Sequence, residues 1–222
     1  TVRREIDPSK RVIELRDGSV VHLNTQSRLQ VVLSHNARVV HLHEGQATFK
    51  VKNDPARPFR VHVDQVVIQA IGTQFDVHRR DDRVIVAVIE GQVEIATGSV
   101  KATSATSRTR VSAGEATTIM SDRQITSPER VNLAEVTAWQ RRQLIFRMNT
   151  LEEIATEFNR YNRTPKIGVE GDALQRRTFL VVRHYDADNP ESLLDFLAAE
   201  DDIEVVRQGE VVTIRQPRCS DG

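Results

Sequence analysis

The residues of this chain that could do chemistry begin with His41 and His43, which are separated by one residue and followed directly by Glu44. Two imidazoles and a carboxylate form a donor set for a transition metal. The surrounding pattern argues against a metal, because Val40 and Leu42 alternate with the histidines and should point into the core of a β-sheet protein. The two histidine rings should then point to solvent.

The same motif resembles part of the metal site of cupin barrels. The cupin glutamate, however, follows several residues after the second histidine, where this chain has Ala47 and Thr48. His22 and His62 also stand between apolar neighbours of a strand pattern. We therefore expect solvated surface histidines, with no bound metal and no other cofactor.

Glu44 and Glu90 could form a carboxylate pair for acid–base catalysis. Each precedes a glycine at the same place in a repeat, RVVHLHEGQATFKV at 38–51 and RVIVAVIEGQVEIA at 83–96, with a weaker echo at 111–119. Such symmetry is typical of corner residues in successive turns. No serine stands in a Gly-x-Ser-x-Gly setting, and there is no glycine-rich phosphate loop. We predict no catalytic residue and no enzyme.

The composition excludes further classes of protein. Among 222 residues, 31 Lys and Arg balance 31 Asp and Glu, and the arginines are scattered, so we expect no nucleic-acid partner. The single cysteine, Cys219, cannot form a disulfide within the chain. No segment reaches the roughly 18 apolar residues of a membrane helix. Because the chain opens at Thr1 without Met, we read it as a fragment of a longer protein.

Apolar and polar residues alternate with period two from Arg11 to about Ile119, with turn residues at the breaks. This pattern is typical of half-buried antiparallel strands and predicts a mainly β domain over 1–136, a stacked sandwich or solenoid-like fold. Its segment 121–136 is predicted to be a linker. The residues expected to point inward are Val12, Val21, Leu23, Val31, Leu33, Val40, Leu42, Phe49, Val51, Phe59, Val61, Val63, Ile68, Ala70, Phe75 and Val77.

A small α+β domain is predicted over 137–217, in the order β-α-β-β-α-β-β, followed by a polar tail at 218–222. Its first helix opens with a capping box, Thr150-x-x-Glu153, and the second begins at Asn189-Pro190-Glu191. Trp139 is expected at the junction of the two domains, although an interface anchor is an alternative role. The strands are expected at 144–146, 166–170, 178–182, 203–206 and 211–214.

Several motifs follow one another along the first domain. They are Val12-x-x-Leu15-x-Asp17-Gly18-Ser19-x-Val21-x-Leu23-Asn24-x-x-Ser27-x-Leu29, Arg38-x-Val40-x-Leu42-x-Glu44-Gly45-x-Ala47-x-Phe49-x-Val51, Arg57-Pro58-Phe59-x-Val61, Ala70-x-Gly72-Thr73-x-Phe75-x-Val77, Val88-x-Glu90-Gly91-x-Val93 and Ala113-Gly114-Glu115. This ordered set resembles the signatures of FecR-type periplasmic sensor domains.

The second domain also carries part of the resemblance. Ala138-Trp139, Leu144-x-Phe146 and Phe158-Asn159-Arg160-Tyr161 are similar to the C-terminal part of that family. That part resembles the short N-terminal domain shared by secretins and TonB-dependent receptors. Where many relatives have Ser-Gly-x-Phe, this chain has Arg177-Thr178-Phe179-Leu180.

The resemblance implies the periplasmic region of a single-pass inner-membrane anti-sigma regulator. Such a region binds the signalling domain of an outer-membrane TonB-dependent transporter, commonly one for ferric siderophores, and relays the signal to an extracytoplasmic-function sigma factor. The membrane helix and the cytoplasmic segment that contacts the sigma factor would precede Thr1.

Partner contacts are expected at an unpaired sheet edge of the second domain, because such an edge accepts a strand from a partner. The candidate edges are Thr178–Arg183 and Val211–Arg215. The residues that we expect to bind the partner are Arg176, Arg177, Thr178, Leu180, Val182, Arg183, Val211, Thr213 and Arg215. Two alternatives are a periplasmic module that binds a sugar or siderophore and a scaffold that stiffens a stalk.

Overall fold

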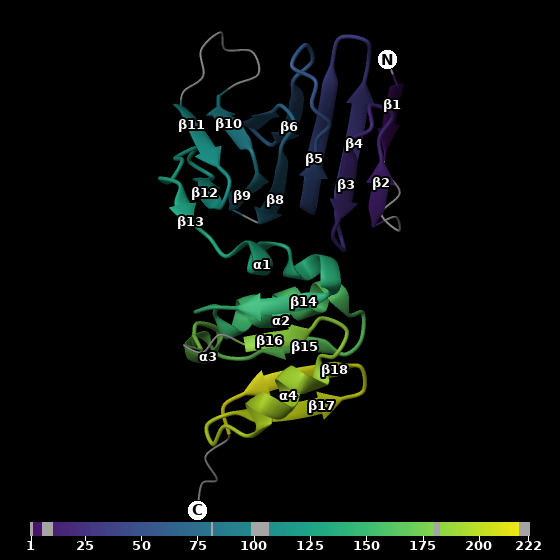
Figure 1. Ribbon diagram of the computed structural model, residues 1–222. Coiled ribbons are helices and arrows are strands. Elements are labelled where there is room, and N and C mark those ends of the chain that lie inside the picture. Colours follow the sequence, from purple (N-terminus) through teal and green to yellow (C-terminus); the bar gives the residue numbers. More distant parts are fainter. Residues whose placement is uncertain (1, 6–10, 81, 99–106, 180–182, 218–222) are drawn as a thin grey trace, which may run out of the picture. The chain divides into compact units, whose positions relative to one another are not determined.

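The computed structural model describes residues 2–5, 11–80, 82–98, 107–179 and 183–217 (Figure 1). The chain divides into two compact units, Thr1–Thr137 and Ala138–Gly222. The first unit consists almost entirely of strands, and the second mixes strands with helices. The predicted fold class, mainly β followed by a small α+β part, is confirmed.

The strands of the first unit form two sheets that share one long strand. In spatial order, sheet A contains β1 (Val2–Glu5), β4 (Arg28–Leu33), the first half of β5 (Arg38–Lys50), β6 (Phe59–Val63), β7 (Val66–Ala70), β10 (Gln92–Thr97) and β11 (Ser107–Ser112). Sheet B contains β2 (Val12–Glu14), β3 (Val20–Leu23), the second half of β5, β8 (Gln74–Arg80), β9 (Arg83–Glu90), β12 (Glu115–Met120) and β13 (Glu129–Arg130).

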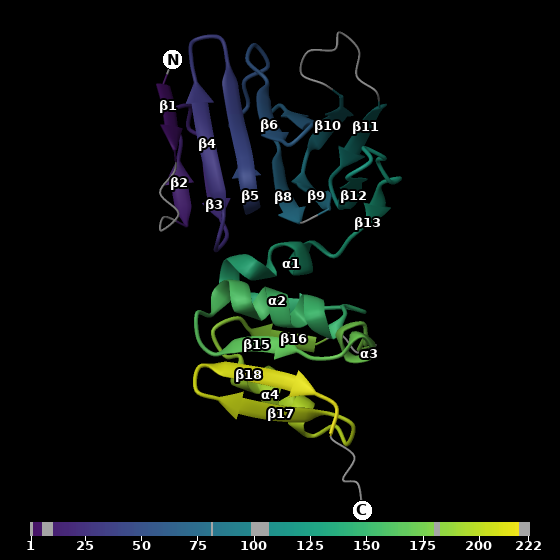
Figure 2. The same ribbon diagram turned by 180° about the vertical axis from the view of Figure 1, so that it is seen from behind.

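Successive hairpins join the two sheets alternately (Figures 1 and 2). The hairpin β6–β7 extends sheet A, β8–β9 extends sheet B, and β10–β11 extends sheet A again. The first unit is therefore a stack of antiparallel units, in agreement with the predicted stacked sandwich.

Both sheets direct alternate side chains into one core. Of the residues expected to point inward, Leu33 is only partly buried and Val12 is wrongly placed. Val12 is 59% exposed because it pairs with His22 on the outer face of sheet B, whereas Ile13 pairs with the buried Val21. The other expected residues all belong to the core cluster.

Glycines stand where the chain passes from one sheet to the other. Gly45 lies at the bend of β5, Gly91 between β9 and β10, and Gly114 between β11 and β12. Their φ angles are +82°, +80° and +83°, a region that only glycine adopts without strain. The repeat that precedes two of these glycines with Glu44 and Glu90 is thus a repeat of corners, as predicted.

The predicted linker 121–136 is wrong, because much of it folds onto the first unit. Glu129 pairs with Ala116 across β13 and β12, and Ile125 bridges to Ile119 and packs against the core. The segment ends in the helical turn α1 (Leu133–Val136). A two-residue strand and a single bridge leave too short a pattern for the sequence to reveal.

The second unit has two small sheets, and along the chain several of their strands are separated by helices. The strand β14 (Gln143–Phe146) pairs with β16 (Arg183–Asp186), while β18 (Val211–Arg215) pairs with β15 (Lys166–Val169) and β17 (Glu204–Gln208). The other elements are η1 (Ala138–Arg141), α2 (Leu151–Tyr161), α3 (Asp172–Gln175) and α4 (Glu191–Ala198). Apolar side chains from all the helices except η1 enter one core.

The sequence predictions for the second unit are confirmed only in part. Thr150 and Glu153 form the predicted capping box of α2, but α4 has Pro190 rather than Asn189 at its N-cap. The short helix α3 was not expected. Of the predicted strand 178–182, residues 180–182 lie outside the described residues, and the described strand begins at Arg183.

Candidate functional site

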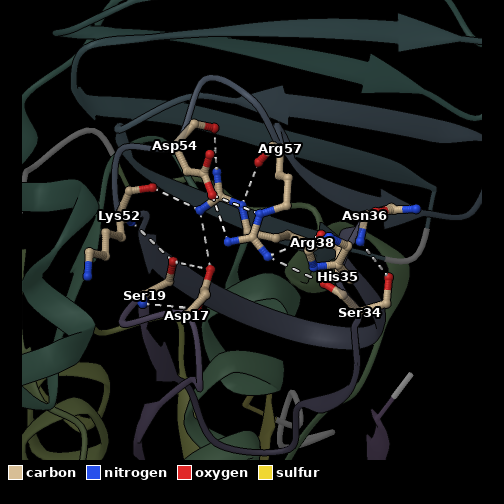
Figure 3. A network of polar contacts seen from close by, with 9 residues as sticks. All are labelled: Asp17, Ser19, Ser34, His35, Asn36, Arg38, Lys52, Asp54 and Arg57. Carbon is tan, nitrogen blue, oxygen red and sulfur yellow. Dashed lines mark hydrogen bonds and ion pairs between the residues drawn. The ribbon is translucent and has the colours of Figure 1, made fainter.

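A buried arginine connects several loops of the first unit (Figure 3). The Arg38 side chain is 1% exposed, and its Nη1 donates to Asp17 Oδ2 at 3.2 Å and to the Lys52 carbonyl at 2.9 Å. Its Nη2 donates to the Asp54 carbonyl at 3.2 Å, and its Nε donates to the Arg57 carbonyl at 2.6 Å. All three guanidinium nitrogens thus bind acceptors of this chain, which indicates a structural role.

The acceptors of Arg38 are themselves held by neighbouring side chains. Asp17 accepts from the backbone and the hydroxyl of Ser19 in the turn between β2 and β3. Asp54 and Arg57 form an ion pair of 2.7 Å, and the hydrogen bond from Arg57 lowers the pKa of Asp54 more than burial raises it. In the sequence Asp17, Arg38 and Arg57 belong to three separate motifs, and only the fold brings them together.

The histidines occupy the outer faces of the sheets, as the parity argument predicted. Val40 and Leu42 are buried, whereas His43 is exposed and His41 half-buried on the opposite side of β5. His62 of β6 is the register neighbour of His41, and the two ring centroids lie 5.1 Å apart.

The two repeat glutamates do not form a catalytic pair. Glu44 stands next to Gly45, which pairs with Arg79 near the end of β8. Glu90 pairs with Gln74 at the beginning of β8. The two carboxylates therefore belong to corners at opposite ends of the same strand.

Two histidines should make the stability of the first unit depend on pH. Burial lowers the pKa of His22 and of His62, and the charge of Lys50 lowers the pKa of His22 further. The charges of His41 and Arg60 act in the same direction on His62. A histidine whose pKa is lower in the folded state stabilises the fold above its unfolded pKa, and this stability is lost as the pH falls toward the folded pKa.

We therefore expect the urea midpoint of unfolding, followed by circular dichroism, to fall as the pH decreases from about 7.5 to about 5.5. The double variant His22→Gln with His62→Gln should show a shallower dependence over the same range. An equally steep dependence in the double variant would contradict the assignment.

One predicted partner-binding edge in the second unit is wrong. β18, which contains Val211, Thr213 and Arg215, is the central strand of the three-stranded sheet and is paired on both sides. Its backbone donors and acceptors are used by β15 and β17, so it cannot accept a further strand. The last strand of the chain was predicted to be an edge, but the order of strands in the sequence does not determine their order in a sheet.

The other predicted edge is described in part. Thr178 is exposed and bridges Thr150, and the backbone of Arg183 pairs with Phe146, whereas Leu180 and Val182 lie outside the described residues. Arg176 is exposed. Thr178 and the backbone of Arg183 therefore lie next to β14 and the residues that directly follow it.

Arg177 is held within the chain. Its Nη2 lies 3.0 Å from Glu200 Oε2, and its Nη1 lies 2.7 Å from Asp202 Oδ1. The hydrogen bond from Arg177 lowers the pKa of Asp202. The guanidinium carbon also lies 5.2 Å from the centre of the Phe179 ring. Arg177 therefore fixes the start of the Thr178 segment.

Met148, which follows β14, was not predicted from the sequence as a site residue. It is 67% exposed, and its φ of +50° is uncommon for a residue other than glycine. Asn149 fixes this loop, because its Oδ1 accepts from the Arg147 backbone at 3.0 Å and its Nδ2 donates to Glu153 at 3.1 Å. An apolar residue directly before the Asn-Thr start of a helix was the signal available in the sequence.

Trp139 is half-buried in η1, and its expected role at the domain junction stays a prediction. A pocket of about 180 Å³ in the first unit is lined by charged residues that include Arg80, Asp82 and Arg123, and no described lining residue is aromatic. The aromatic concavity that a sugar or siderophore site needs is not seen in this pocket. Among the described helices, none is both long and apolar enough to cross a membrane.

The sequence of the first unit matches a known protein family. Residues 5–94 match the family described as FecR protein. The chain carries a FecR domain. The matched residues include Asp17, Arg38 and Gly45, so the buried arginine network and the first glycine corner both lie in the FecR domain. No curated protein matches the chain closely enough to count as a relative.

Two solved structures share the fold. Both are crystal structures of a presumed anti-sigma factor from Parabacteroides distasonis ATCC 8503. One has 21% sequence identity and a TM-score of 0.81, with 97% of this chain and 100% of that chain covered. The other has 20% identity and a TM-score of 0.80, with 98% and 100% covered. At this level of identity, the likeness concerns the fold.

Proposed function

We propose that this chain is the periplasmic signal-receiving region of a membrane-anchored anti-sigma regulator. The observation that carries the proposal is the FecR domain, and the fold shared with a presumed anti-sigma factor agrees with it. The partner is the periplasmic signalling domain of an outer-membrane TonB-dependent transporter, commonly one for a ferric siderophore. The signal then passes through a membrane helix to an extracytoplasmic-function sigma factor. The region acts by binding and not by catalysis.

The second unit offers a surface on which such a partner domain can add a strand. The strands β14 and β16 each pair with a single strand among the described residues, so each lies at an edge of its sheet. Edges of this kind bind an extended segment of a partner through main-chain hydrogen bonds. Thr178 forms a β-bridge with Thr150, which follows β14 in the chain, and Arg176, two residues before Thr178, is also exposed.

Met148 supplies an apolar anchor next to this edge. Its loop is fixed by Asn149, so the side chain is presented without the loss of backbone freedom that a mobile loop would incur on binding. Methionine adapts well to irregular apolar pockets. We define the docking patch as Met148, Arg176, Thr178 and the backbone of β16.

The test is a calorimetric titration of this chain with the isolated periplasmic signalling domain of its transporter. We expect a Kd of tens of micromolar or tighter, corresponding to about −6 kcal/mol or better. Met148→Glu should weaken binding by at least about tenfold, because it places a charge against an apolar pocket. Arg176→Glu should weaken it as well.

Val211→Glu is the matched control, because Val211 is also an exposed apolar residue of the second unit but belongs to the fully paired β18. The Val211→Glu variant should bind the signalling domain with the same affinity as the unmodified chain. If Val211→Glu abolishes binding and Met148→Glu does not, the docking patch is wrong. If no signalling domain binds at tens of micromolar, the proposed function is wrong.

A further inference from the structure

Two imidazoles face each other across the only parallel strand pair described in the first unit. His41 of β5 and His62 of β6 are register neighbours at the end of the ladder that begins with Arg38 and Phe59. Both rings lie on the outer face of sheet A, and their centroids are 5.1 Å apart with planes tilted by 38°. His43 lies on the same face of β5.

The separation of the first two rings matches that of two histidines on one metal ion. Zinc binds imidazole nitrogen at about 2.0–2.1 Å in a tetrahedral arrangement, which places two ring centroids roughly 5 Å apart. The His41 and His43 rings are nearly parallel, with centroids 6.1 Å apart, so His43 does not fit as a third ligand. Among the described residues, no three His, Cys, Asp or Glu side chains converge on one position.

The register neighbours of the two histidines in sheet A are uncharged. On its far side His62 pairs with Val67 of β7. The neighbour of His41 on the other side is Gln30 of β4, an uncharged residue that does not compete for a cation. Glu44, the residue after His43, forms an ion pair with Arg28, with 3.9 Å between Oε2 and Nε.

We propose that His41 and His62 form a two-imidazole site for a divalent transition metal, such as Cu²⁺, Zn²⁺ or Ni²⁺, whose remaining ligands are water. This inference goes beyond the proposed signalling function and does not depend on it. Strand parity keeps the His41 ring out of a barrel interior, whereas this site lies on the outer face of a sheet. A bound ion would clamp β5 to β6, and a ligand that binds only the folded state raises its stability.

The test is a titration of the tag-free chain with each metal chloride, followed by calorimetry and by thermal unfolding. We expect one micromolar site that is tightest for Cu²⁺ and a higher unfolding temperature, reversed by a chelator, with no binding of Mg²⁺ or Ca²⁺. His41→Gln and His62→Gln should each weaken binding by at least about tenfold. His22→Gln, on the outer face of sheet B, is the matched control and should retain full affinity.

A second measurement needs no variant. Substoichiometric Cu²⁺ should broaden the imidazole NMR signals of His41 and His62 before those of His22 and His184. Unchanged affinity in both His41→Gln and His62→Gln, or equal loss in His22→Gln, would overturn the site, as would broadening that spares these two rings. Transporter-domain binding measured on His41→Gln should stay intact, so failure of the metal site leaves the signalling proposal standing.

Discussion

Replacing Arg38 by alanine should lower the free energy of unfolding of the FecR domain by about 3–5 kcal/mol. The substitution leaves the carboxylate of Asp17, only 6% exposed, without its cationic partner. It also removes the donors to the carbonyls of Lys52, Asp54 and Arg57. A buried acceptor that loses its donor keeps its desolvation cost, which is why the expected loss greatly exceeds that of a surface ion pair.

The measurement is urea unfolding followed by circular dichroism, with amide hydrogen exchange in β5 and β6 to locate the loss. Amide hydrogen exchange in α2, which belongs to the second unit, serves as an internal reference. The matched control is Arg108→Ala, which removes an ion pair with Glu94 whose side chains are 66% and 41% exposed. That control should cost at most about 1 kcal/mol. Equal losses for Arg38→Ala and Arg108→Ala would contradict the structural role of the buried network.

Gly45→Ala should destabilise the FecR domain by about 2–4 kcal/mol. Two costs add. The φ of +82° is strained for any residue with a Cβ, and this Cβ would lie 2.1 Å from Ser27 Oγ and 2.7 Å from Ser27 Cα. Because one of these atoms belongs to the backbone, the clash cannot be relieved by turning a side chain.

Gly114→Ala separates the two costs. Gly114 has nearly the same φ, +83°, but no atom lies within 4 Å of its added Cβ. We therefore expect only the conformational cost of about 1 kcal/mol at this position. Both variants are compared by urea unfolding under the same conditions. If Gly45→Ala and Gly114→Ala lose the same stability, close packing at the corner does not matter.

Features set by neighbouring residues could be predicted from the sequence. Alternation of apolar residues predicted the inward faces of β5, β6 and β8, and the same parity placed His41 and His43 outside. The capping box of α2 was also correct, since Thr150 and Glu153 lie within one helical turn. Val12 fails because β2 has only three residues, too few for alternation to fix its register.

The candidate sites were less predictable, because they depend on contacts between distant segments. Nothing near Val211 indicates that Lys166 will pair with it, and that pairing turns β18 from an edge into a central strand. Met148 was passed over because exposure depends on what packs around a loop.

The sequence by itself determined the period of the strands, the glycine corners and the resemblance to FecR-type domains, because each depends on residues a few positions apart. Only the tertiary structure decided which edges stay unpaired, that Arg38 reaches Asp17, and that His41 faces His62. Those contacts join residues about twenty or more positions apart in the chain. Their partners are set by how strands stack and not by any local pattern.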